Sequence, residues 1–495
     1  MRQAKLWVVA VCALLVGALV AAVSFSRTTA PPRSMVTATI LQMNDVYEIM
    51  PLGGTNQGGV ARVATVRKQL ERENPNTYTI LAGDLFSPSA LGRALVDGRR
   101  LSGRQMVDVM NRVGLKYATF GNHEFDLAKS DFDERLKESQ FRWVSANVTG
   151  ADGEPFPGVV TRTVIIAANS AGRQMRLGLF GLTLDINKQA YVRYADPIET
   201  ARKQVEALKN EANVIVAITH LSFDQDEALA EAVPEISLIL GGHEHQNVQA
   251  RRGARMVPIA KADANAKSVY IHHLRYDAVT KRVDIESQLK TIGPDTAEDP
   301  TVADAARRWR DAAFAAFGAE GLEPDKTVAT LPAELDGREA SVRTQSTNLT
   351  QLVGRAMLDA FPGADAAIFN SGSIRIDDIL PPGPMTQYDV LRVLPFSETV
   401  SAAKVRGSLL KRIADVGRDD KHRNTGGYLQ MVGVDPGRIS PDRDYRVVMN
   451  QYLLDGKERG LEFIGQRSAA LVVLPGPALT FQRAVIKRLE THGAQ

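Results

Sequence analysis

The chain has 495 residues, more than a single hydrophobic core usually organises, so two domains with additional segments are expected. Its charge is nearly balanced, at 60 lysines and arginines against 57 aspartates and glutamates, with a formal net charge of +3. This balance, together with the lack of any basic block interleaved with aromatic residues, argues against a nucleic acid polymer as the partner.

The first 34 residues have the pattern of an export signal or an N-terminal anchor. Arg2 and Lys5 precede an uninterrupted apolar run over residues 6–23, and small residues cluster where this run ends. Cleavage there would release the protein into the periplasm or the extracellular space, whereas an uncleaved run is long enough to remain in a membrane. The one cysteine, Cys12, lies within the run, so the exported part has no thiol for a disulfide or a metal. We expect a monomer that contacts a membrane only if the segment is retained.

Residues 35–290 alternate between strand and helix patterns, which predicts an α/β domain. In the first helix, for example, Val63, Val66 and Leu70 recur on one face. Strands are predicted over residues 37–43, 78–82, 117–120, 177–181, 213–219, 236–240, 269–271 and 283–285, and helices over residues 60–73, 105–113 and 198–211. In sheets of this kind, ligands bind at the carboxyl ends of the strands.

The alternation of strand and helix patterns stops after residue 290. Residues 291–325 begin with a turn-rich stretch and continue into an alanine-rich segment that predicts a helix over residues 302–317. A second, smaller α/β segment follows over residues 326–495. Its helices are predicted over residues 348–360, 388–393 and 481–489, and its strands over residues 366–369 and 445–449. Two domains joined by a helical linker are therefore expected.

Potential metal ligands follow five of the predicted strands in the first domain. They are Asp45, Asp84, Asn122, His220 and the pair His243 and His245. Carboxylate, carboxamide and imidazole groups together suit Zn²⁺, Mn²⁺ or Fe, and no cysteine is available for a thiolate site. The set predicts a centre for two divalent ions about 3.5–4 Å apart, bridged by Asp84, that holds a hydroxide for in-line attack on phosphorus.

The stretch over residues 121–126, Gly-Asn-His-Glu-Phe-Asp, follows one of these strands. His123 can move a proton near neutral pH, and Asp126 lies close enough in sequence to hydrogen-bond the imidazole. Taken alone, the stretch is equally compatible with an Asn-Gly-type turn that carries a surface histidine. The ligand-type residues at the other strand ends favour the catalytic interpretation.

The ordered set Asp…Gly-Asp…Gly-Asn-His-Glu…His…Gly-His-x-His resembles the exported 5′-nucleotidase/UDP-sugar hydrolase family of calcineurin-like metallophosphoesterases, over nearly the whole exported chain. The resemblance implies a four-layer α/β/β/α metallophosphoesterase domain with two metal ions, followed by a smaller α/β 5′-nucleotidase C-terminal domain that binds the nucleoside. It also implies a large hinge rotation that carries substrate to the metals. By position, Asp45, Asp84 and His245 would hold the first ion, Asp84, Asn122, His220 and His243 the second, and His123 with Asp126 would act on the phosphoryl group or the leaving oxygen.

The first motif departs from that family. The family usually has Asp-x-His, whereas this chain has Asp45-Val46-Tyr47. A neutral phenol is a poor ligand for Zn²⁺ or Mg²⁺. Either the first site is weaker, with water in the missing place, or Tyr47 binds Fe³⁺ as a phenolate, and the identity of the metal therefore stays open.

The second domain carries a resembling substrate site. The run Asn-Ser-Gly-Ser-Ile-Arg over residues 370–375 is similar to the family's Asn-Gly-Gly-Gly-Ile-Arg loop. An arginine there presents a planar fork to phosphate or carboxylate. The resemblance places two aromatic rings around the base and an acidic residue at the ribose, although Glu458 replaces the family's aspartate. The implied substrate-binding residues are Arg343, Asn370, Arg375, Phe396, Tyr452 and Glu458.

Four histidines lie outside these motifs. His272 and His273 are adjacent in a strand-like run, so they point to opposite faces, and we interpret them as structural. His422 and His492 lie in polar segments and are expected to be solvated.

The sequence therefore predicts an exported, metal-dependent 5′-nucleotidase that hydrolyses nucleotide phosphate esters to nucleoside and phosphate by attack of a metal-bridging hydroxide. A 2′,3′-cyclic nucleotide phosphodiesterase or a UDP-sugar diphosphatase on the same site remains an alternative. A nucleotide- or phosphate-binding protein with a weakened metal site is an alternative of another class, motivated by Tyr47. A sulfur-compound hydrolase on the same scaffold is disfavoured by the intact arginine and aromatic set.

Overall fold

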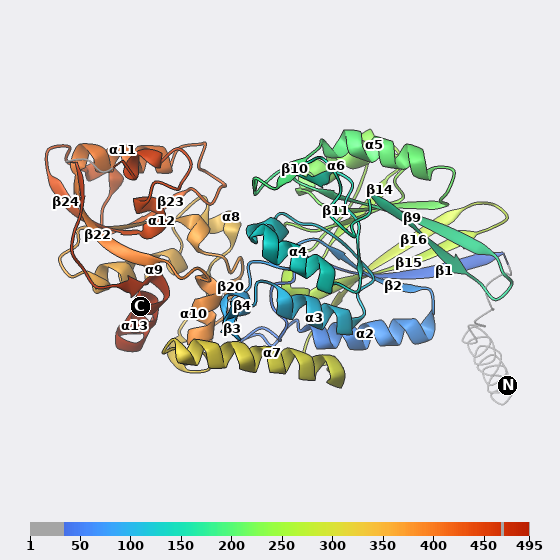
Figure 1. Ribbon diagram of the computed structural model, residues 1–495, viewed down its shortest axis with the longest axis horizontal. Coiled ribbons are helices and arrows are strands. Elements are labelled where there is room, and N and C mark those ends of the chain that lie inside the picture. Colours follow the sequence, from blue (N-terminus) through green and yellow to red (C-terminus); the bar gives the residue numbers. More distant parts are fainter. Residues whose placement is uncertain (1–33, 467–469, 495) are drawn as a thin grey trace, which may run out of the picture.

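The computed structural model describes residues 34–466 and 470–494, which form two α/β domains (Figure 1). The predicted export segment lies outside the described residues. Within these ranges no helix is long and apolar enough to cross a membrane.

The N-terminal domain contains two six-stranded sheets. In the first, the parallel strands β1, β2, β5 and β6 continue through the antiparallel strands β15 and β16. The strand order and bounds are β16 (Val283–Thr291), β15 (Ser268–Asp277), β1 (Met35–Met43), β2 (Thr77–Ala82), β5 (Tyr117–Thr119) and β6 (Arg142–Trp143). The buried strands expected from the sequence therefore lie side by side.

The second sheet is built in the same way. Its strands β9, β11, β12 and β14 are parallel, and an antiparallel strand closes each edge. The order is β13 (Val248–Arg252), β14 (Val257–Lys261), β12 (Leu238–Gly241), β11 (Val214–His220), β9 (Gln174–Thr183) and β8 (Arg162–Ala168). Small pairs are formed by β3 (Leu95–Val96) with β4 (Arg99–Arg100), and by β7 (Val148–Gly150) with β10 (Val192–Tyr194).

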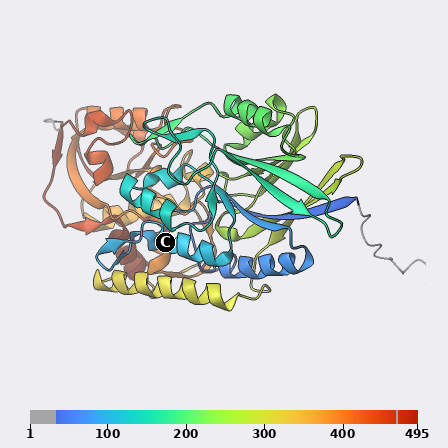
Figure 2. The same cartoon turned by 45° about the vertical axis from the view of Figure 1, so that its right-hand side comes forward.

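Helices cover the outer face of each sheet, which confirms the predicted four-layer α/β/β/α architecture (Figure 2). The layer on the first sheet contains α2 (Val60–Glu73), α3 (Arg104–Val113) and α4 (Lys129–Glu138), and the layer on the second contains α5 (Pro197–Leu208) and α6 (Phe223–Ala232). Alternation along β1 explains the layering, since Val36, Ala38 and Ile40 belong to the core between the sheets, whereas Leu41 and Met43 face the helices.

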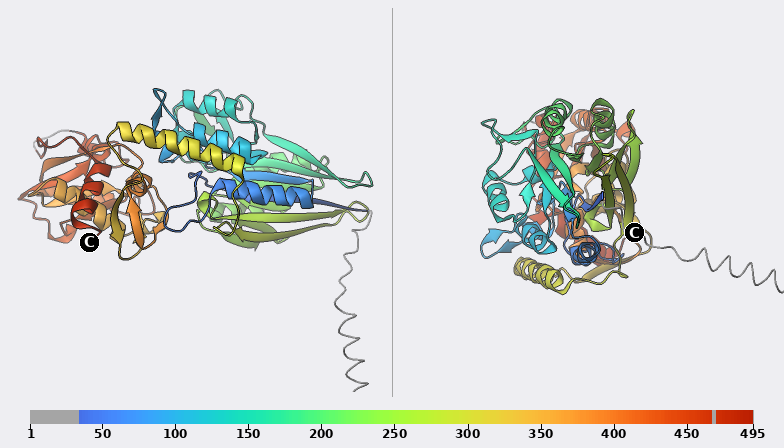
Figure 3. Two further views of the ribbon diagram at one scale, coloured as in Figure 1. Left: turned by 90° about the horizontal axis from the view of Figure 1, so that it is seen from below. Right: turned by 90° about the vertical axis from the view of Figure 1, so that its right-hand side faces the viewer.

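Helix α7 (Pro300–Ala319) connects the domains. It packs along α2 and α3, as Figure 3 shows from below. Asp299 caps its first turn by accepting a hydrogen bond from the Val302 N–H (3.2 Å), and Trp309 Nε1 donates to Asp108 of α3 (2.8 Å). The connection is thus anchored on the N-terminal domain over much of its length.

The C-terminal domain has one mixed sheet with helices on both faces. The sheet order is β23 (Leu429–Val432), β19 (Ala366–Asn370), β24 (Asp444–Asn450), β22 (Thr399–Arg406) and β25 (Leu471–Val473), with β26 (Leu479–Thr480) also paired to β22. Helices α9 (Asn348–Ala360) and α13 (Phe481–His492) belong to one core, and α11 (Gly407–Gly417) and α12 (Gln451–Leu454) belong to the other. Two further pairs are formed by β17 (Thr327–Leu331) with β21 (Gly383–Thr386) and by β18 (Leu335–Asp336) with β20 (Ile379–Leu380). Helices α8 (Glu339–Val342) and α10 (Gln387–Val393) lie on the side that faces the N-terminal domain (Figure 1).

The two domains meet through a buried polar cluster. Glu48, in the loop after β1, accepts a hydrogen bond from the Tyr388 hydroxyl (2.8 Å) and pairs with Arg392 (3.4 Å). Both partners belong to α10. Charged groups removed from water in this way are stable only when paired. The cluster therefore determines the position of α10 against the N-terminal domain.

One expectation about the histidines is wrong. His422 is buried, with 7% of its surface exposed, and is held between Asp419 (Nδ1 to Oδ1, 2.8 Å) and the Arg459 carbonyl (Nε2 to O, 2.7 Å). Its polar sequence neighbours supply these partners instead of exposing the ring. The other predicted surface histidine, His492, has a side chain that is 60% exposed.

Candidate metal centre

The loops after β1 and β2 form the floor of the candidate site. Asp45 and Asp84 both adopt the left-handed backbone conformation, at φ values of 52° and 57°, which aspartate tolerates better than most residues. The Asp45 N–H donates to the Gly83 carbonyl (3.0 Å), and the Val46 N–H donates to the Asp84 carbonyl (2.9 Å). These bonds join the two loops and bring both carboxylates to one edge of the sheet.

Glycines allow the ligand loops to approach one another. A Cβ on Gly83 would lie 2.3 Å from Nδ1 of His220, and a Cβ on Gly121 would lie 2.0 Å from Oδ1 of Asp84. Both distances are far below van der Waals contact. The glycines before Asp84 and Asn122 are therefore required by the packing of the site.

A buried lysine positions the loop that carries the last two histidines. Lys261 donates to the carbonyls of Leu221 (2.7 Å) and Gly242 (2.9 Å) and pairs with Asp226 (2.9 Å). The Lys261 side chain is almost fully removed from solvent. It thus connects β14, which carries it, to the loop after β12 that leads to His243.

Three of the predicted ligands converge directly. Asp45, Asp84 and His220 each place a ligand atom so that all lie within 4.8 Å of one another. His220 Nε2 lies 3.3 Å from Asp84 Oδ2 and 3.8 Å from Asp45 Oδ1. His245 joins them, with Nε2 at 3.3 Å from Asp45 Oδ1.

Neighbouring backbone groups hold the two carboxylates in this orientation. Oδ2 of Asp45 accepts from the His243 N–H (2.9 Å), and Oδ1 of Asp84 accepts from the His123 N–H (2.9 Å). The second oxygen of each carboxylate then faces the cluster. Hydrogen bonds of this kind orient ligands in metal sites.

The residues fit a bound cation. His220 Nδ1 donates to the Ala82 carbonyl (2.9 Å), so Nε2 faces the carboxylates. His220 Nε2 and the Asn122 carboxamide oxygen are both buried and make no hydrogen bond within the described residues. Buried polar atoms without partners are rare, and a divalent ion would satisfy both.

The electrostatics agree with this fit. Burial alone would lower the pKa of His220, but the carboxylates of Asp84 and Asp45 raise it to about 9. Burial and the neighbouring His220 lower the pKa of His243 to about 3, so that ring stays neutral and can act as a ligand. His243 lies beside His220, with 5.3 Å between the ring centroids. The cluster thus attracts a positive charge at its centre.

Tyr47 points into this centre. Its hydroxyl donates to Asp84 Oδ2 (2.8 Å) and lies 3.2 Å from Asp45 Oδ1 and 3.0 Å from His245 Nε2. Burial, followed by the charges of Asp84 and Asp45, raises the pKa of the phenol well above its usual value. The Tyr47 oxygen therefore lies among the predicted ligand atoms as a neutral hydrogen-bond donor.

His123 and Asp126 lie at the rim of the cluster. His123 Nδ1 is 2.7 Å from Asp126 Oδ2, and Asp126 also accepts from Ser87 Oγ (2.9 Å) and Asn187 Nδ2 (2.7 Å). Although burial opposes ionisation, His123 and the other donors lower the pKa of Asp126. The carboxylate is thus held by several groups and can orient and charge-stabilise the imidazole.

Sequence reasoning did not single out Glu124, which organises the same loops. Its buried carboxylate accepts from the backbone N–H groups of Leu85 (2.5 Å), Gly121 (2.5 Å) and Asp84 (3.1 Å). Burial, followed by the charge of Asp84, raises its pKa to about 7. An acidic residue directly after the histidine of Gly-Asn-His-Glu was the available signal, but its role depends on a loop 39 residues away.

The C-terminal domain reaches the centre at three points. Arg375 places Nη2 at 3.2–3.3 Å from the ring nitrogens of His123 and 4.0 Å from Asp126. Asp377, which was not predicted, places Oδ2 at 2.5 Å from Nδ1 of His245. Lys267 of the N-terminal domain pairs with Asp378 (3.1 Å). The site is therefore built from both domains.

The other predicted substrate residues are less closely grouped. Phe396 is 43% exposed, and its ring lies 5.8 Å from the Arg375 guanidinium carbon. Tyr452 and Glu458 are half-buried near each other, and the charge of Glu458 helps burial to raise the pKa of the phenol. Asn370 is turned inward, where its Oδ1 accepts from Ser373 Oγ (3.0 Å) and Asn450 Nδ2 (3.0 Å). Phe396 and Tyr452 make no ring contact with each other in the described structure.

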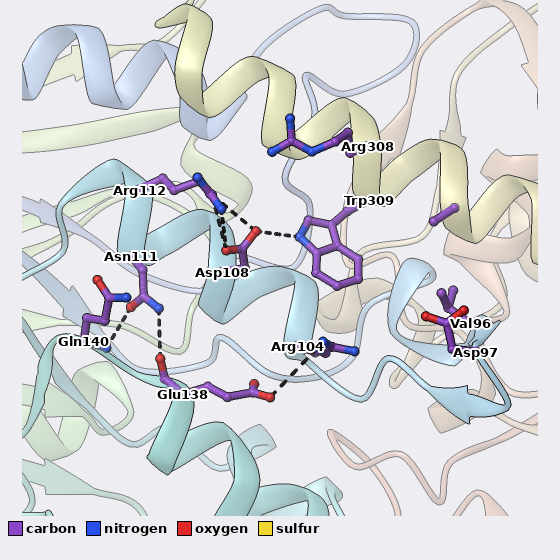
Figure 4. Close-up of a pocket in the computed structure, with 11 residues that line it drawn as sticks. Val96, Asp97, Arg104, Asp108, Asn111, Arg112, Glu138, Gln140, Arg308 and Trp309 are labelled. Atoms are coloured by element: carbon purple, nitrogen blue, oxygen red, sulfur yellow. Dashed lines mark hydrogen bonds and ion pairs between the residues drawn. The ribbon is translucent and has the colours of Figure 1, made fainter.

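Little open space remains between the domains. A hollow of about 20 Å³ is lined by Tyr47, Arg375, Arg392 and neighbouring residues. A larger hollow of about 610 Å³ lies away from the metal centre, between α3, α4 and α7 (Figure 4). There Asp108 is already paired with Arg112 (3.1 Å) and with Trp309 (2.8 Å), and nothing in it resembles catalytic chemistry.

The layered fold and the strand-end cluster define a metallophosphoesterase. Residues 38–247 match the calcineurin-like phosphoesterase family, and residues 327–437 match the 5′-nucleotidase C-terminal domain. The chain belongs to the 5′-nucleotidase family of calcineurin-like phosphoesterases, which are hydrolases that use divalent metals.

Curated relatives share this organisation. A trifunctional nucleotide phosphoesterase of Bacillus subtilis is 24% identical over 457 residues, which is 82% of this chain but 29% of the relative. The 5′-nucleotidase of Bos taurus is 24% identical over 443 residues, which covers 80% of this chain and 74% of the relative. The chain thus spans less than a third of the Bacillus protein and about three quarters of the bovine one.

Solved structures agree with the fold. The 5′-nucleotidase precursor from Thermus thermophilus has a TM-score of 0.72 at 24% identity and covers 92% of this chain and 96% of its own. The sulfate thiohydrolase SoxB from the same genus has a TM-score of 0.68 at 15% identity, covering 92% of this chain and 94% of its own. The two-domain arrangement is therefore shared with proteins that are named for different activities.

Proposed function

We propose that the protein is an exported, metal-dependent 5′-nucleotidase that converts a nucleotide to nucleoside and phosphate. The observation that carries this proposal is the meeting of Arg375 from one domain with His123 and the Asp45–Asp84–His220 cluster of the other. A phosphate ester bound by the arginine would lie beside both the proton-transfer group and the cation site. The N-terminal apolar run supports export, and we propose that the exported protein acts as a monomer.

We propose that two divalent ions occupy the centre. The residues that would hold them are Asp45, Asp84, Asn122, His220, His243 and His245. Ions bound there would supply Lewis acidity toward phosphoryl oxygens. The orphaned oxygen of Asn122 and the orphaned nitrogen of His220 support this assignment.

The chain's own groups have distinct tasks. Asp126 holds the imidazole of His123, which would stabilise the phosphoryl group or protonate the leaving oxygen. Arg343 and Arg375 would bind the phosphate through charge-assisted hydrogen bonds. We further propose that Phe396 and Tyr452 bind the base, that Glu458 contacts the ribose, and that Asn370 supports the substrate loop.

We propose that the domains separate to admit the substrate. Ligand pockets usually measure about 300–1,000 Å³. The hollow of about 20 Å³ at the interface is far smaller than a nucleotide. Closure around bound substrate would exclude water and orient the phosphate.

Two alternatives keep specific support. The name of the Bacillus relative, a trifunctional nucleotide phosphoesterase, favours activity on more than one kind of nucleotide ester, and a 2′,3′-cyclic nucleotide or a UDP-sugar is the alternative substrate. The hydroxyl of Tyr47 lies among the predicted ligand atoms, which favours a nucleotide-binding protein with a weak metal site.

A substrate panel tests these possibilities. Purified protein would be incubated with AMP, 2′,3′-cyclic AMP or UDP-glucose, each in the presence of Zn²⁺, Mn²⁺, Co²⁺ or Fe²⁺. We expect metal-dependent phosphate release that is fastest from AMP. Preferred hydrolysis of the cyclic or diphosphate ester would assign one of the alternative activities, and nucleotide binding without turnover under any metal would overturn the enzymatic proposal.

A further inference from the structure

A carboxylate pairs with both arginines of the proposed substrate site. Glu339 forms an ion pair with Arg343, four residues later, and its Oε1 lies 3.8 Å from Nη1 of Arg375. All three side chains are largely buried, with 27%, 22% and 12% of the side chains of Glu339, Arg343 and Arg375 exposed. An anion therefore already occupies the point on which the two guanidinium groups converge.

The position of Glu339 is set by its backbone. Its N–H donates to Oδ1 of Asp377 (2.5 Å), whose other oxygen contacts His245. The same Arg375 contacts His123. Glu339 thus lies at the junction of the arginine pair and the catalytic groups, and a substrate phosphate reaching both arginines must displace the carboxylate or lie against it.

Glu339 lowers the net positive charge that the two arginines offer to a phosphate. Two guanidinium groups contribute two positive charges, and Glu339 removes one of them. A phosphate monoester is mostly a dianion at neutral pH, whereas a phosphodiester is a monoanion. A fixed negative charge repels the dianion more strongly, and repulsion between partly buried charges is screened less than repulsion at the surface.

We propose that Glu339 is an internal anion that competes with substrate phosphate for Arg343 and Arg375 and thereby reduces, without reversing, the preference for monoesters over diesters. This inference rests on the proposed phosphoesterase function and names a determinant of its substrate class. A purely structural role makes the opposite prediction. If Glu339 only held Arg343 in place, its loss would release the arginine and weaken anion binding.

Binding of inorganic phosphate separates the two roles without any turnover. Calorimetry would compare wild type, Glu339→Gln and the matched control Glu334→Gln, whose exposed side chain lies on the same domain. Each protein would be titrated in its metal-free and its Mn²⁺-loaded form. We expect Glu339→Gln to bind phosphate at least about threefold more tightly, given the screening of partly exposed pairs, and the control to match wild type. Unchanged or weaker binding by Glu339→Gln would overturn the proposal.

Turnover of two aryl esters tests the selectivity. The kcat/KM for 4-nitrophenyl phosphate should rise more in Glu339→Gln than that for bis(4-nitrophenyl) phosphate. Equal changes for both esters would refute discrimination by charge. If neither ester is hydrolysed by any variant, the proposed function fails while the phosphate titration still decides the role of Glu339. Thermal unfolding of each variant checks folding, and Glu339→Ala replaces the glutamine variant if that variant is unstable.

Discussion

At the scale of single residues, His123 combines an oriented ring with access to the inter-domain space. Its Nδ1 contacts Asp126, and its side chain is 14% exposed. We expect His123→Ala to lower kcat by about 10²–10⁴-fold, because a positioned proton-transfer group is lost. Metal content should not change, since His123 hydrogen-bonds a predicted ligand, Asp84, through its backbone N–H and its ring is not among the predicted ligands. Steady-state kinetics and elemental analysis would measure both, with the exposed His492→Ala as control. Turnover at the wild-type level would remove His123 from the mechanism.

Tyr47 offers a direct test of the weaker metal position. Its hydroxyl already lies about 3 Å from Asp84, Asp45 and His245. Replacement by a better ligand, Tyr47→His, should tighten the more weakly held ion by about 10-fold or more, as measured by competition with a chelator. A visible charge-transfer band in the Fe³⁺-loaded wild type that disappears in Tyr47→Phe would instead establish the phenolate as a ligand.

His272 provides a pH-dependent contribution to stability. Gln42 uses its amide N–H groups on the carbonyls of Gly241 (3.0 Å) and Ala260 (2.9 Å), so its Oε1 must accept from His272 Nε2 (2.8 Å). His272 Nδ1 then accepts from the Ser287 hydroxyl (2.8 Å). This network suits a neutral ring, and burial lowers the pKa of His272 to about 3.

The sign of the effect follows from proton uptake. The unfolded chain protonates His272 near pH 6.5, whereas the folded protein does so only near pH 3, so this contribution to stability is lost as the pH falls through that window. We expect the free energy of unfolding to fall less steeply between pH 7 and pH 4 in His272→Gln than in wild type, by up to about 1.4 kcal/mol per pH unit. Urea unfolding at several pH values measures the slope. His492→Gln should retain the wild-type slope, and an unaltered slope in His272→Gln would contradict the assignment.

The ligand-type residues could be found from sequence because each directly follows an apolar strand, and such strand ends share one edge of a sheet. Asp45, Asp84 and His220 illustrate this rule. Glu124, Glu339 and Asp377 could not be found in the same way. Their roles depend on loops or domains that meet only in three dimensions. The position of Glu124 after the histidine was a weak signal, and for Glu339 and Asp377 no local pattern distinguishes them from surface acids.

At the scale of elements, strong apolar periodicity gave accurate bounds, as in α2 and α9, whose observed ranges match the predicted ones. Three helices of ten or more residues were missed, namely α4, α6 and α11, although Leu410, Ile413 and Ala414 recur on the buried face of α11. Helix α4 buries only Phe132 and Arg135, and α6 is a mixture of acidic residues and alanine. Strand β22 was missed because its alternation is carried by small residues such as Ala402.

The loop after β5 should tolerate no side chain at Gly121. Gly121→Ala would place its Cβ 2.0 Å from Oδ1 of Asp84, so the carboxylate or the loop must move. We expect a lower Tm and reduced metal binding, measured by calorimetry and metal titration. Gly318→Ala is the matched control, since its helical site has no heavy atom within 4 Å, and it should raise stability by about 0.5–1 kcal/mol. Normal metal binding by Gly121→Ala would show that the loop is more tolerant than its packing implies.

At the scale of the whole molecule, the proposed site needs both domains, and the aromatic residues test this dependence. Phe396→Ala combined with Tyr452→Ala should lower kcat/KM for AMP by at least about tenfold, equivalent to about 1.4 kcal/mol of lost binding to the base. Hydrolysis of 4-nitrophenyl phosphate, which has no nucleobase, should be nearly unchanged. Parallel losses on both substrates would mean that the two rings support the fold and do not recognise the base.

The hydrogen bond between Asp377 and His245 has a consequence for the solution behaviour of the protein. It links a side chain of one domain to a candidate ligand of the other, so any separation of the domains must break it. A carboxylate on the far nitrogen strengthens an imidazole as a ligand. Thermodynamic coupling is reciprocal. Closure of the two domains would therefore raise the affinity of the site for its metal ion, and binding of the metal ion would raise the fraction of molecules whose domains are closed. The concentration of free metal ion around the protein would then set how long the two domains remain apart between turnovers.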